Sequence, residues 1–287
     1  MKFYLLLVTV FILSCQKTIE LKDIPQQNLG LLPDDPIKVA NVQLIVSKDF
    51  LISNRGKPDK KPPIVVDPPL DTLSSYDMKV PPIGSQGREG SCVAFAVGYG
   101  AKSIHEYYKN AATSYSYSTN IFSPEFLYNQ TKFGDCGSGT AMQTALDFIK
   151  TNGIVPWSIM PYTDTDCSTL PTAQQSIQAQ VYKISEYYKI YTTDSTMIKT
   201  LVRQNKAVII GICVDYAFMN AKTGFIWKNT GSALGVGHSI VIIGYNDQLK
   251  AWKIINSFGT AWGTNGFAYI EYSMFPTRTG TYCYSIK

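Results

Sequence analysis

Histidine is scarce in this chain of 287 residues, where it occurs only twice, as His105 and His238. Any mechanism that needs an imidazole base near neutral pH therefore has just two candidates. No group of cysteines and histidines has the spacing of a zinc site, and no glycine-rich loop has that of a phosphate-binding turn. The sequence therefore implies no metal and no cofactor.

Strong charge and long apolar runs are lacking as well. The formal net charge is only +5, and no basic run with interleaved aromatic residues points to nucleic-acid binding. Residues 3–13 are apolar but too few to span a bilayer as a stable helix. With 45% hydrophobic and 16% charged residues, the composition is typical of a soluble enzyme with one large domain or two small lobes.

The N-terminus has the pattern of an export signal. A lysine at position 2 precedes the apolar core at 3–13, and residues 12–15 resemble the cleavage site of a bacterial lipoprotein signal. We therefore expect residues 1–14 to be removed and Cys15 to carry a lipid. The mature protein would then be exported and tethered to a bacterial membrane, facing the periplasm or the cell surface. The alternative is an ordinary secretory signal in which Cys15 is incidental.

Cys92 begins a stretch that is predicted to be a helix as far as about Tyr108. Apolar or small residues recur there at spacings of three and four, at Val93, Ala96, Val97, Gly100, Ile104 and Tyr107. A thiol with a pKa of about 8.5 is mostly protonated at neutral pH, so a nucleophilic Cys92 needs an imidazolium and the positive end of this helix. His105 is poorly placed for that role, about 20 Å along the same helix.

His238 is the better candidate for the base. It opens an apolar, β-branched run that predicts a buried strand, and residues 251–255 predict a second strand that ends at Asn256. If the two strands are adjacent, Asn256 can orient the imidazole through the ring nitrogen that faces away from the thiol. Taken singly, each of these residues is more often structural than catalytic.

The order of these motifs resembles that of the papain-like cysteine peptidases. The stretches that match are 86–96, 235–245 and 256–267, supported by blocks at 122–128 and 136–139. His238 follows Cys92 by 146 residues (238 − 92) and Asn256 by 164 (256 − 92), where roughly 130–150 is expected. The resemblance covers about residues 70–287, and we place the peptidase domain at 71–287.

The resemblance implies an α+β papain-like fold in two lobes, with Cys92 in a helical lobe and His238 and Asn256 in a β-rich one. The active-site cleft would lie between them. It implies a cysteine endopeptidase, expected to be a monomer, that hydrolyses extended polypeptides through a Cys-His-Asn triad and a thioester acyl-enzyme. Gln86 would contribute its side-chain amide to the oxyanion hole, beside the N–H of Cys92.

Substrate contacts follow from the same resemblance. Ser138, Gly139 and Gly237 are expected to line the cleft, although Gly139 by itself is equally consistent with a plain turn. Residues 15–70 are expected to be a lipid-anchored, proline-rich, solvated tether, because ten of the 15 prolines precede residue 83. Within the tether, residues 42–46 can form one strand docked on the body. No long charged helical prodomain is present, so a zymogen mechanism is not supported, although this short segment can still cover the cleft.

Export permits disulfides. Besides Cys15 and Cys92, four cysteines remain, which allow three pairings. The family resemblance favours Cys136–Cys167. Cys213 is predicted to be a buried strand thiol, and a pairing of Cys213 with Cys283 is a guess.

Four positions depart from the family pattern. Glu89 replaces a cysteine, Val93 an aromatic residue, Ser138 a glycine, and Phe258 the tryptophan that shields the bond between asparagine and histidine. None of these changes removes a catalytic atom. Glu89 would raise the pKa of the Cys92 thiol if its carboxylate pointed inward.

Two other functions are compatible with the motifs. One is a catalytically silent surface lipoprotein that binds peptides or a partner; the intact set of Gln86, Cys92, His238 and Asn256 argues against it. The other is a related thiol chemistry, such as transferase activity or cell-wall peptide amidase activity, which fold alone does not decide.

Overall fold

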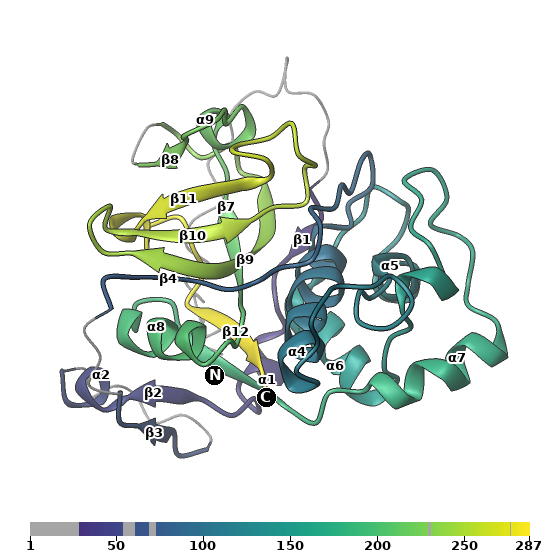
Figure 1. Cartoon of the computed structure of the whole chain (residues 1–287), viewed down its shortest axis with the longest axis horizontal. Helices are drawn as coiled ribbons and strands as arrows, with labels where there is room; N and C mark the ends of the chain where they lie inside the picture. The colour runs from purple at the N-terminus through teal and green to yellow at the C-terminus, as the bar shows by residue number, and fades with distance from the viewer. Residues whose placement is uncertain (1–28, 54–60, 69–72, 229–230, 276) are drawn as a thin grey trace, which may run out of the picture.

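The structure is a computed structural model that describes residues 29–53, 61–68, 73–228, 231–275 and 277–287. Figure 1 shows two lobes side by side, one mainly helical and one built on a sheet. The expected α+β, two-lobe architecture is therefore confirmed. The predicted signal peptide and Cys15 lie outside the described residues. Within those residues, no helix is long and apolar enough to cross a bilayer.

The helical lobe is organised around one helix that begins at Cys92. It comprises α3 (Cys92–Ala94), the π-helical stretch η1 (Phe95–Lys102) and α4 (Ser103–Lys109). The predicted helix is confirmed, and its whole apolar stripe is buried. Around it lie α5 (Pro124–Thr131), α6 (Met142–Thr151) and α7 (Ala173–Ala179), with the short 3₁₀ turns η2 (Trp157–Ile159) and η3 (Gln180–Tyr182).

The other lobe holds an eight-stranded sheet within the described part of the chain. Its strands are β4 (Ser75–Asp77), β6 (Tyr187–Tyr191), β7 (Val208–Cys213), β8 (Ile226–Trp227), β9 (Gly237–Asn246), β10 (Ala251–Ile255), β11 (Phe267–Glu271) and β12 (Tyr282–Ile286). The order is β6-β12-β7-β9-β10-β11-β8, with β4 paired to β9. All pairs are antiparallel except β11 with β8.

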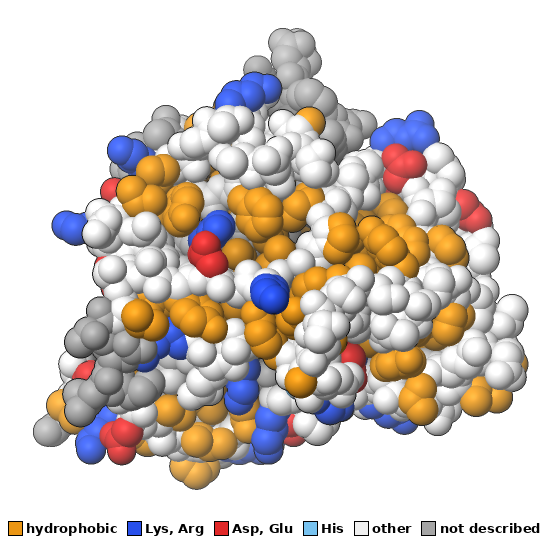
Figure 2. Space-filling model, viewed as in Figure 1, with side chains coloured by type: hydrophobic (Ala, Val, Ile, Leu, Met, Phe, Trp, Pro, Cys, Tyr) orange, Lys and Arg blue, Asp and Glu red, His pale blue; other side chains and the backbone are white. Residues whose placement is uncertain are grey.

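Strand β9 lies inside the sheet, between β7 and β10, and is buried along almost its whole length. Eight consecutive residues from His238 to Tyr245 are buried, as the continuous apolar run predicts. Helices α8 (Ser195–Arg203) and α9 (Tyr216–Met219) and the 3₁₀ turn η4 (Tyr272–Met274) complete this lobe. On the face shown in Figure 2, apolar side chains gather in patches over both lobes, and charged side chains are scattered between them.

The described residues before position 70 pack against the body. They form β1 (Leu31–Leu32), α1 (Pro36–Val39), β2 (Ile45–Ser47), α2 (Lys48–Ser53) and β3 (Ile64–Val66). Strand β1 pairs with β5 (Thr140–Ala141), β2 pairs with β3, and Leu44 bridges to Lys189 of β6. The expected solvated tether is therefore wrong for residues 29–47, where apolar side chains such as Leu29, Val42 and Ile45 are buried, whereas most apolar side chains of α2 and β3 stay exposed. The predicted docked strand at 42–46 is present, shifted to β2.

Candidate active site

Two neighbouring strands bring the predicted base and its partner together. His238 is the second residue of β9, and Asn256 follows the last residue of β10, which pairs antiparallel with β9. His238 Nε2 lies 2.6 Å from Asn256 Oδ1. The ring of Phe258 stacks on the imidazole, with 4.7 Å between centroids and 28° between planes. Phe258 therefore lies over the imidazole, at the position where the family pattern has a tryptophan.

Cys92 is fully buried at the N-terminal end of α3, which packs against β9. The backbone N–H groups of Ser239 and Val93 act to lower the pKa of its thiol. His238 Nδ1, the ring nitrogen that faces away from Asn256, has no hydrogen-bond partner among the described residues. His105 lies farther along the same helix, on α4, and takes no part in this cluster.

Gln86 and Cys92 aim two donors at one oxygen. Gln86 Oε1 accepts from Ser257 Oγ at 2.7 Å, and its Nε2 donates to Glu89 O at 2.9 Å. The same Nε2 also donates to Leu29 O, at 3.4 Å, and the Cys92 backbone N–H donates to that oxygen at the same distance. The two donors that the sequence analysis assigns to an oxyanion hole therefore converge on the carbonyl oxygen of Leu29.

The residues after Leu29 continue along the cleft. Gly30 O accepts from Thr140 N at 2.8 Å, and β1 runs parallel to β5. A Cβ added to Gly139 would lie 1.8 Å from Gly30 O, and one added to Gly237 would lie 3.1 Å from Leu31 O. Gly139 and Gly237 therefore approach residues 30 and 31 through their bare backbones, and their role in binding substrate stays a prediction.

Ser138, the third predicted substrate contact, makes hydrogen bonds through both its hydroxyl and its carbonyl. Its hydroxyl donates to Asp135 Oδ1 at 2.8 Å, and its carbonyl accepts from the Tyr128 hydroxyl at 2.8 Å. The serine side chain thus braces its own loop.

Sequence reasoning missed the contact of residues 29–32 with the catalytic cluster. The signal that points to it is the apolar run Leu-Gly-Leu-Leu inside an otherwise polar, proline-rich segment. Gly30 has a φ of +92°, and a Cβ on it would lie 1.7 Å from Gly90 O. Only glycine permits this approach of one backbone to another.

Burial suppresses the charges of the catalytic pair in this conformation. It raises the pKa of the Cys92 thiol to about 12, despite the nearby backbone N–H groups. It lowers the pKa of His238 to about 4, although the bond to Asn256 acts in the opposite direction. At neutral pH Cys92 is therefore a thiol and His238 a neutral imidazole, not a thiolate and an imidazolium.

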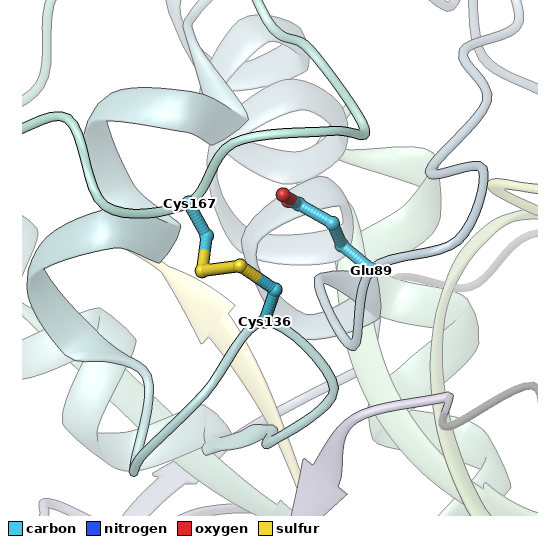
Figure 3. A group of neighbouring side chains, drawn as sticks. All are labelled: Glu89, Cys136 and Cys167. Atoms are coloured by element: carbon cyan, nitrogen blue, oxygen red, sulfur yellow. A yellow bond between two sulfur atoms is a disulfide. The ribbon is translucent and has the colours of Figure 1, made fainter.

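The favoured disulfide is present between Cys136 and Cys167, 31 residues apart. Cys283 is a free, buried thiol and Cys213 is disulfide-bonded, so both the guess that these two pair and the prediction that Cys213 is a strand thiol are wrong. Figure 3 shows Glu89 beside this disulfide; one carboxylate oxygen and the two sulfurs lie within 4.8 Å of one another. Because the sulfurs are bonded to each other, they do not form a metal site. Glu89 does not act on the Cys92 thiol either, since the groups that shift the pKa of Cys92 are backbone N–H groups and burial.

Comparison with known proteins gives consistent matches. A family model described as papain family cysteine protease matches residues 70–281. The cathepsin L-like proteinase of Fasciola hepatica is 29% identical over 218 residues, which are 75% of this chain and 60% of that protein. The gamete and mating-type specific protein A of Dictyostelium discoideum is 30% identical over 195 residues, 67% of this chain and 40% of that protein. The chain thus spans between 40% and 60% of the length of these two relatives.

Solved structures share the fold. Xylellain, a cysteine protease from Xylella fastidiosa, superimposes with a TM-score of 0.71 at 21% identity, covering 94% of this chain and 99% of that one. The bromelain protease from Ananas comosus, in complex with the E64 inhibitor, gives 0.59 at 20% identity, covering 75% and 99%. The predicted papain-like fold is therefore confirmed.

Proposed function

This chain belongs to the papain family of cysteine proteases, and we propose that it hydrolyses peptide bonds of extended polypeptides with Cys92 as its nucleophile. The observation that carries the proposal is the convergence of Gln86 Nε2 and Cys92 N on one carbonyl oxygen. Two donors aimed at one oxygen suit the negative charge that develops there when a nucleophile attacks the carbonyl carbon.

The reaction follows from this arrangement. His238 takes the proton of the Cys92 thiol as the sulfur forms a bond to the substrate carbonyl carbon, and the carbonyl oxygen takes the negative charge between Gln86 Nε2 and the Cys92 N–H. The carbon–nitrogen bond then breaks, and His238 gives its proton to the leaving amine. Water, activated by the same imidazole, hydrolyses the thioester and releases the acid. Asn256 holds the ring in position throughout, through its 2.6 Å contact with Nε2.

Access to this site requires residues 29–32 to move. Leu29 O fills the oxyanion hole, Gly30 O takes the backbone donor of Thr140, and Leu31 lies against Gly237. The fully buried Cys92 and His238 are also electrically neutral in this state. The conformation described is therefore a latent one, in which the chain's own N-terminal segment excludes substrate.

The test is intact-mass analysis after incubation with E64 under reducing conditions at neutral pH. The chain opened by Gly30→Ala should gain one adduct, and the same chain carrying Cys92→Ala should gain none. If the opened chain stays unlabelled, the peptidase proposal fails and a binding lipoprotein takes its place. Product analysis then separates hydrolysis from the alternatives: an acceptor amine in the product indicates a transferase, and released wall peptides indicate an amidase.

We also propose that the mature chain is lipid-anchored at Cys15. The support is the sequence pattern at residues 1–15, which resembles a lipoprotein signal. Mass analysis of the N-terminal peptide from membrane fractions should show a diacylglyceryl Cys15. An unlipidated protein in which Cys15 is held in a disulfide would contradict this assignment.

A further inference from the structure

The hydroxyl of Tyr162 lies among three oxygens of the loop that carries the nucleophile. Its Oη is 2.7 Å from Gln86 O, 2.7 Å from Ser91 Oγ and 3.2 Å from Glu89 Oε2. The Tyr162 ring is held edge-on against Phe95, with 4.8 Å between centroids. One fixed phenol therefore contacts the residue that supplies the oxyanion amide and the residue that precedes Cys92.

A proton count restricts how these contacts can coexist. Tyr162 has one proton to donate, and Gln86 O can only accept. Ser91 can donate its own hydroxyl proton to the phenol. Glu89 can donate as well, but only when its carboxyl group is protonated. All three contacts are hydrogen bonds with neutral Glu89, whereas ionised Glu89 competes with Gln86 O for the single phenolic proton.

The surroundings of Glu89 favour its neutral form. The residue is 2% exposed, and its Oε1 has no hydrogen-bond partner in the part of the chain described. Figure 3 shows its side chain beside the Cys136–Cys167 disulfide, which offers no positive charge. A buried carboxylate without a cationic partner is costly, so such a group keeps its proton.

The groups that face Glu89 from neighbouring elements add to this effect. They are Glu125 on α5, Asp164 and Asp166 in the loop after η2, and the phenols Tyr162 and Tyr128. Arg88, the adjacent cation, is exposed and pairs with Asp164 at 3.6 Å. Burial first, and then the charge of Glu125, raise the pKa of Glu89 to about 7, while the bond to Tyr162 acts in the opposite direction.

We infer that Glu89 is a positioning residue for the oxyanion hole, acting through Tyr162. This inference rests on the proposed peptidase function. When Glu89 is protonated, the Tyr162 hydroxyl keeps its hydrogen bond to Gln86 O as well as its contact with Ser91 Oγ. It therefore holds both ends of residues 86–91 in place. Ionised Glu89 draws that proton away and frees the Gln86 carbonyl. Because Gln86 also donates its side-chain amide to Glu89 O, a shift of this loop moves the oxyanion donors, and small displacements of such donors are costly in rate.

The inference predicts an upper pH limit to activity that a purely structural Glu89 would not produce. The parent kcat/KM should fall as pH rises through about 7. The amide introduced by Glu89→Gln donates to Tyr162 at every pH, so this variant should keep its activity one pH unit higher. There it should exceed the parent by up to about tenfold, mainly in kcat.

The kinetic test uses the full-length chain opened by Gly30→Ala, with active sites counted by E64 labelling. Glu125→Gln, which removes a nearby negative charge, should move the upper limit to lower pH, whereas removal of the remote Glu186 by Glu186→Gln should leave it unchanged. If Glu89→Gln shows the same upper limit as the parent, the inference is overturned. A chain that does not react with E64 at all contradicts the proposed function instead.

A second measurement needs no activity. In the full-length chain, the ¹⁵N shifts of the Ser91 and Cys92 amides should titrate with a midpoint near 7, together with the ¹³C shift of the Glu89 carboxyl. The amide titration should disappear in Glu89→Gln and in Tyr162→Phe, because either change breaks the proton competition. Amide shifts that do not respond near pH 7, or that respond equally in both variants, contradict the inference even if the enzyme is inactive.

Discussion

The backbone N–H of Cys92 donates a hydrogen bond to the carbonyl oxygen of Leu29, at 3.4 Å. A residue 63 positions earlier in the chain (92 − 29) thus uses a donor that the proposed reaction needs for its oxyanion. The contact is made by backbone on both sides. It therefore depends on the path of the chain through the cleft, which Gly30 makes possible.

Gly30→Ala should open the cleft. The new Cβ would collide with Gly90 O, and the φ of +92° would be strained for alanine. We expect Cys92 to react with iodoacetamide at least about tenfold faster than in the parent, because a shift of one or two kcal/mol toward the open state changes its population by that order. Mass spectrometry follows the rate.

Gly224→Ala is the matched control for this experiment. Gly224 also has a positive φ, +80°, but a Cβ on it meets nothing within 4 Å. The Gly224→Ala substitution therefore imposes similar backbone strain, but without a steric clash and outside residues 29–32. Equal acceleration in both variants would contradict an opening specific to residues 29–32.

Acid should weaken the closed conformation. The pKa of His238 is about 4 when buried and about 6.5 when the ring is solvated. Below pH 6.5 the open chain therefore binds a proton that the closed chain excludes. The closed state is therefore most stable above about pH 6.5. Between about pH 6.5 and pH 4, the equilibrium constant for closing falls by up to tenfold for each pH unit.

Hydrogen exchange of peptides covering residues 29–34, corrected for the intrinsic pH dependence, measures this opening. Burial raises the pKa of Asp34 on the same segment, so the titration of Asp34 opposes the histidine effect at the acid end of this range. The informative window is therefore the upper part of the range, just below about pH 6.5. His238→Gln should remove the dependence in that window, and a dependence that survives in this variant would assign it to another group.

Gln86→Ala should lower kcat about 10²-fold to 10³-fold with little effect on KM, because it deletes one oxyanion donor. Ser257→Ala, which removes only the 2.7 Å hydrogen bond to Gln86 Oε1, should have a smaller effect in the same direction. Both are measured in the Gly30→Ala chain. Alkylation of Cys92 needs no oxyanion hole and should persist in both. An unchanged kcat in Gln86→Ala would exclude the assigned role.

Phe258→Ala should reduce kcat by about fivefold, equivalent to about 1 kcal/mol for a lost ring contact. The ring stacks on His238 and covers its bond to Asn256. Phe258→Trp keeps the cover and should retain most of the activity. If the alanine and tryptophan variants are equally impaired, shape at this position matters more than shielding.

Loss of the Cys136–Cys167 disulfide should destabilise the chain by about 3–4 kcal/mol, the entropy of closing a loop of this length. The bond spans 31 residues, and urea unfolding of the Cys136→Ser/Cys167→Ser double variant gives the difference in free energy of unfolding. Cys283→Ser replaces a buried free thiol without breaking a cross-link. A loss no larger than that of this control would show that the disulfide contributes little.

The sequence by itself determined the elements that carry the proposed catalytic residues. Helix spacing placed Cys92 at the start of a helix, and apolar runs placed His238 at the start of one strand and Asn256 at the end of another. These features are local: they depend on residues within a few positions of each other, or on the length of an uninterrupted buried run. The disulfide followed from the resemblance, not from spacing alone.

Only the tertiary structure decided what lies in the cleft and how the site is charged. The proline-rich stretch before residue 70 indicated extended chain, but nothing local shows that Leu29 would reach Cys92 or that Gly30 would fit against Gly90. The departure at Glu89 was visible, but the direction of its side chain, toward the disulfide and Tyr162, was not. Burial and hydrogen-bond partners arise from segments distant in sequence, and they set pKa values and access to the thiol.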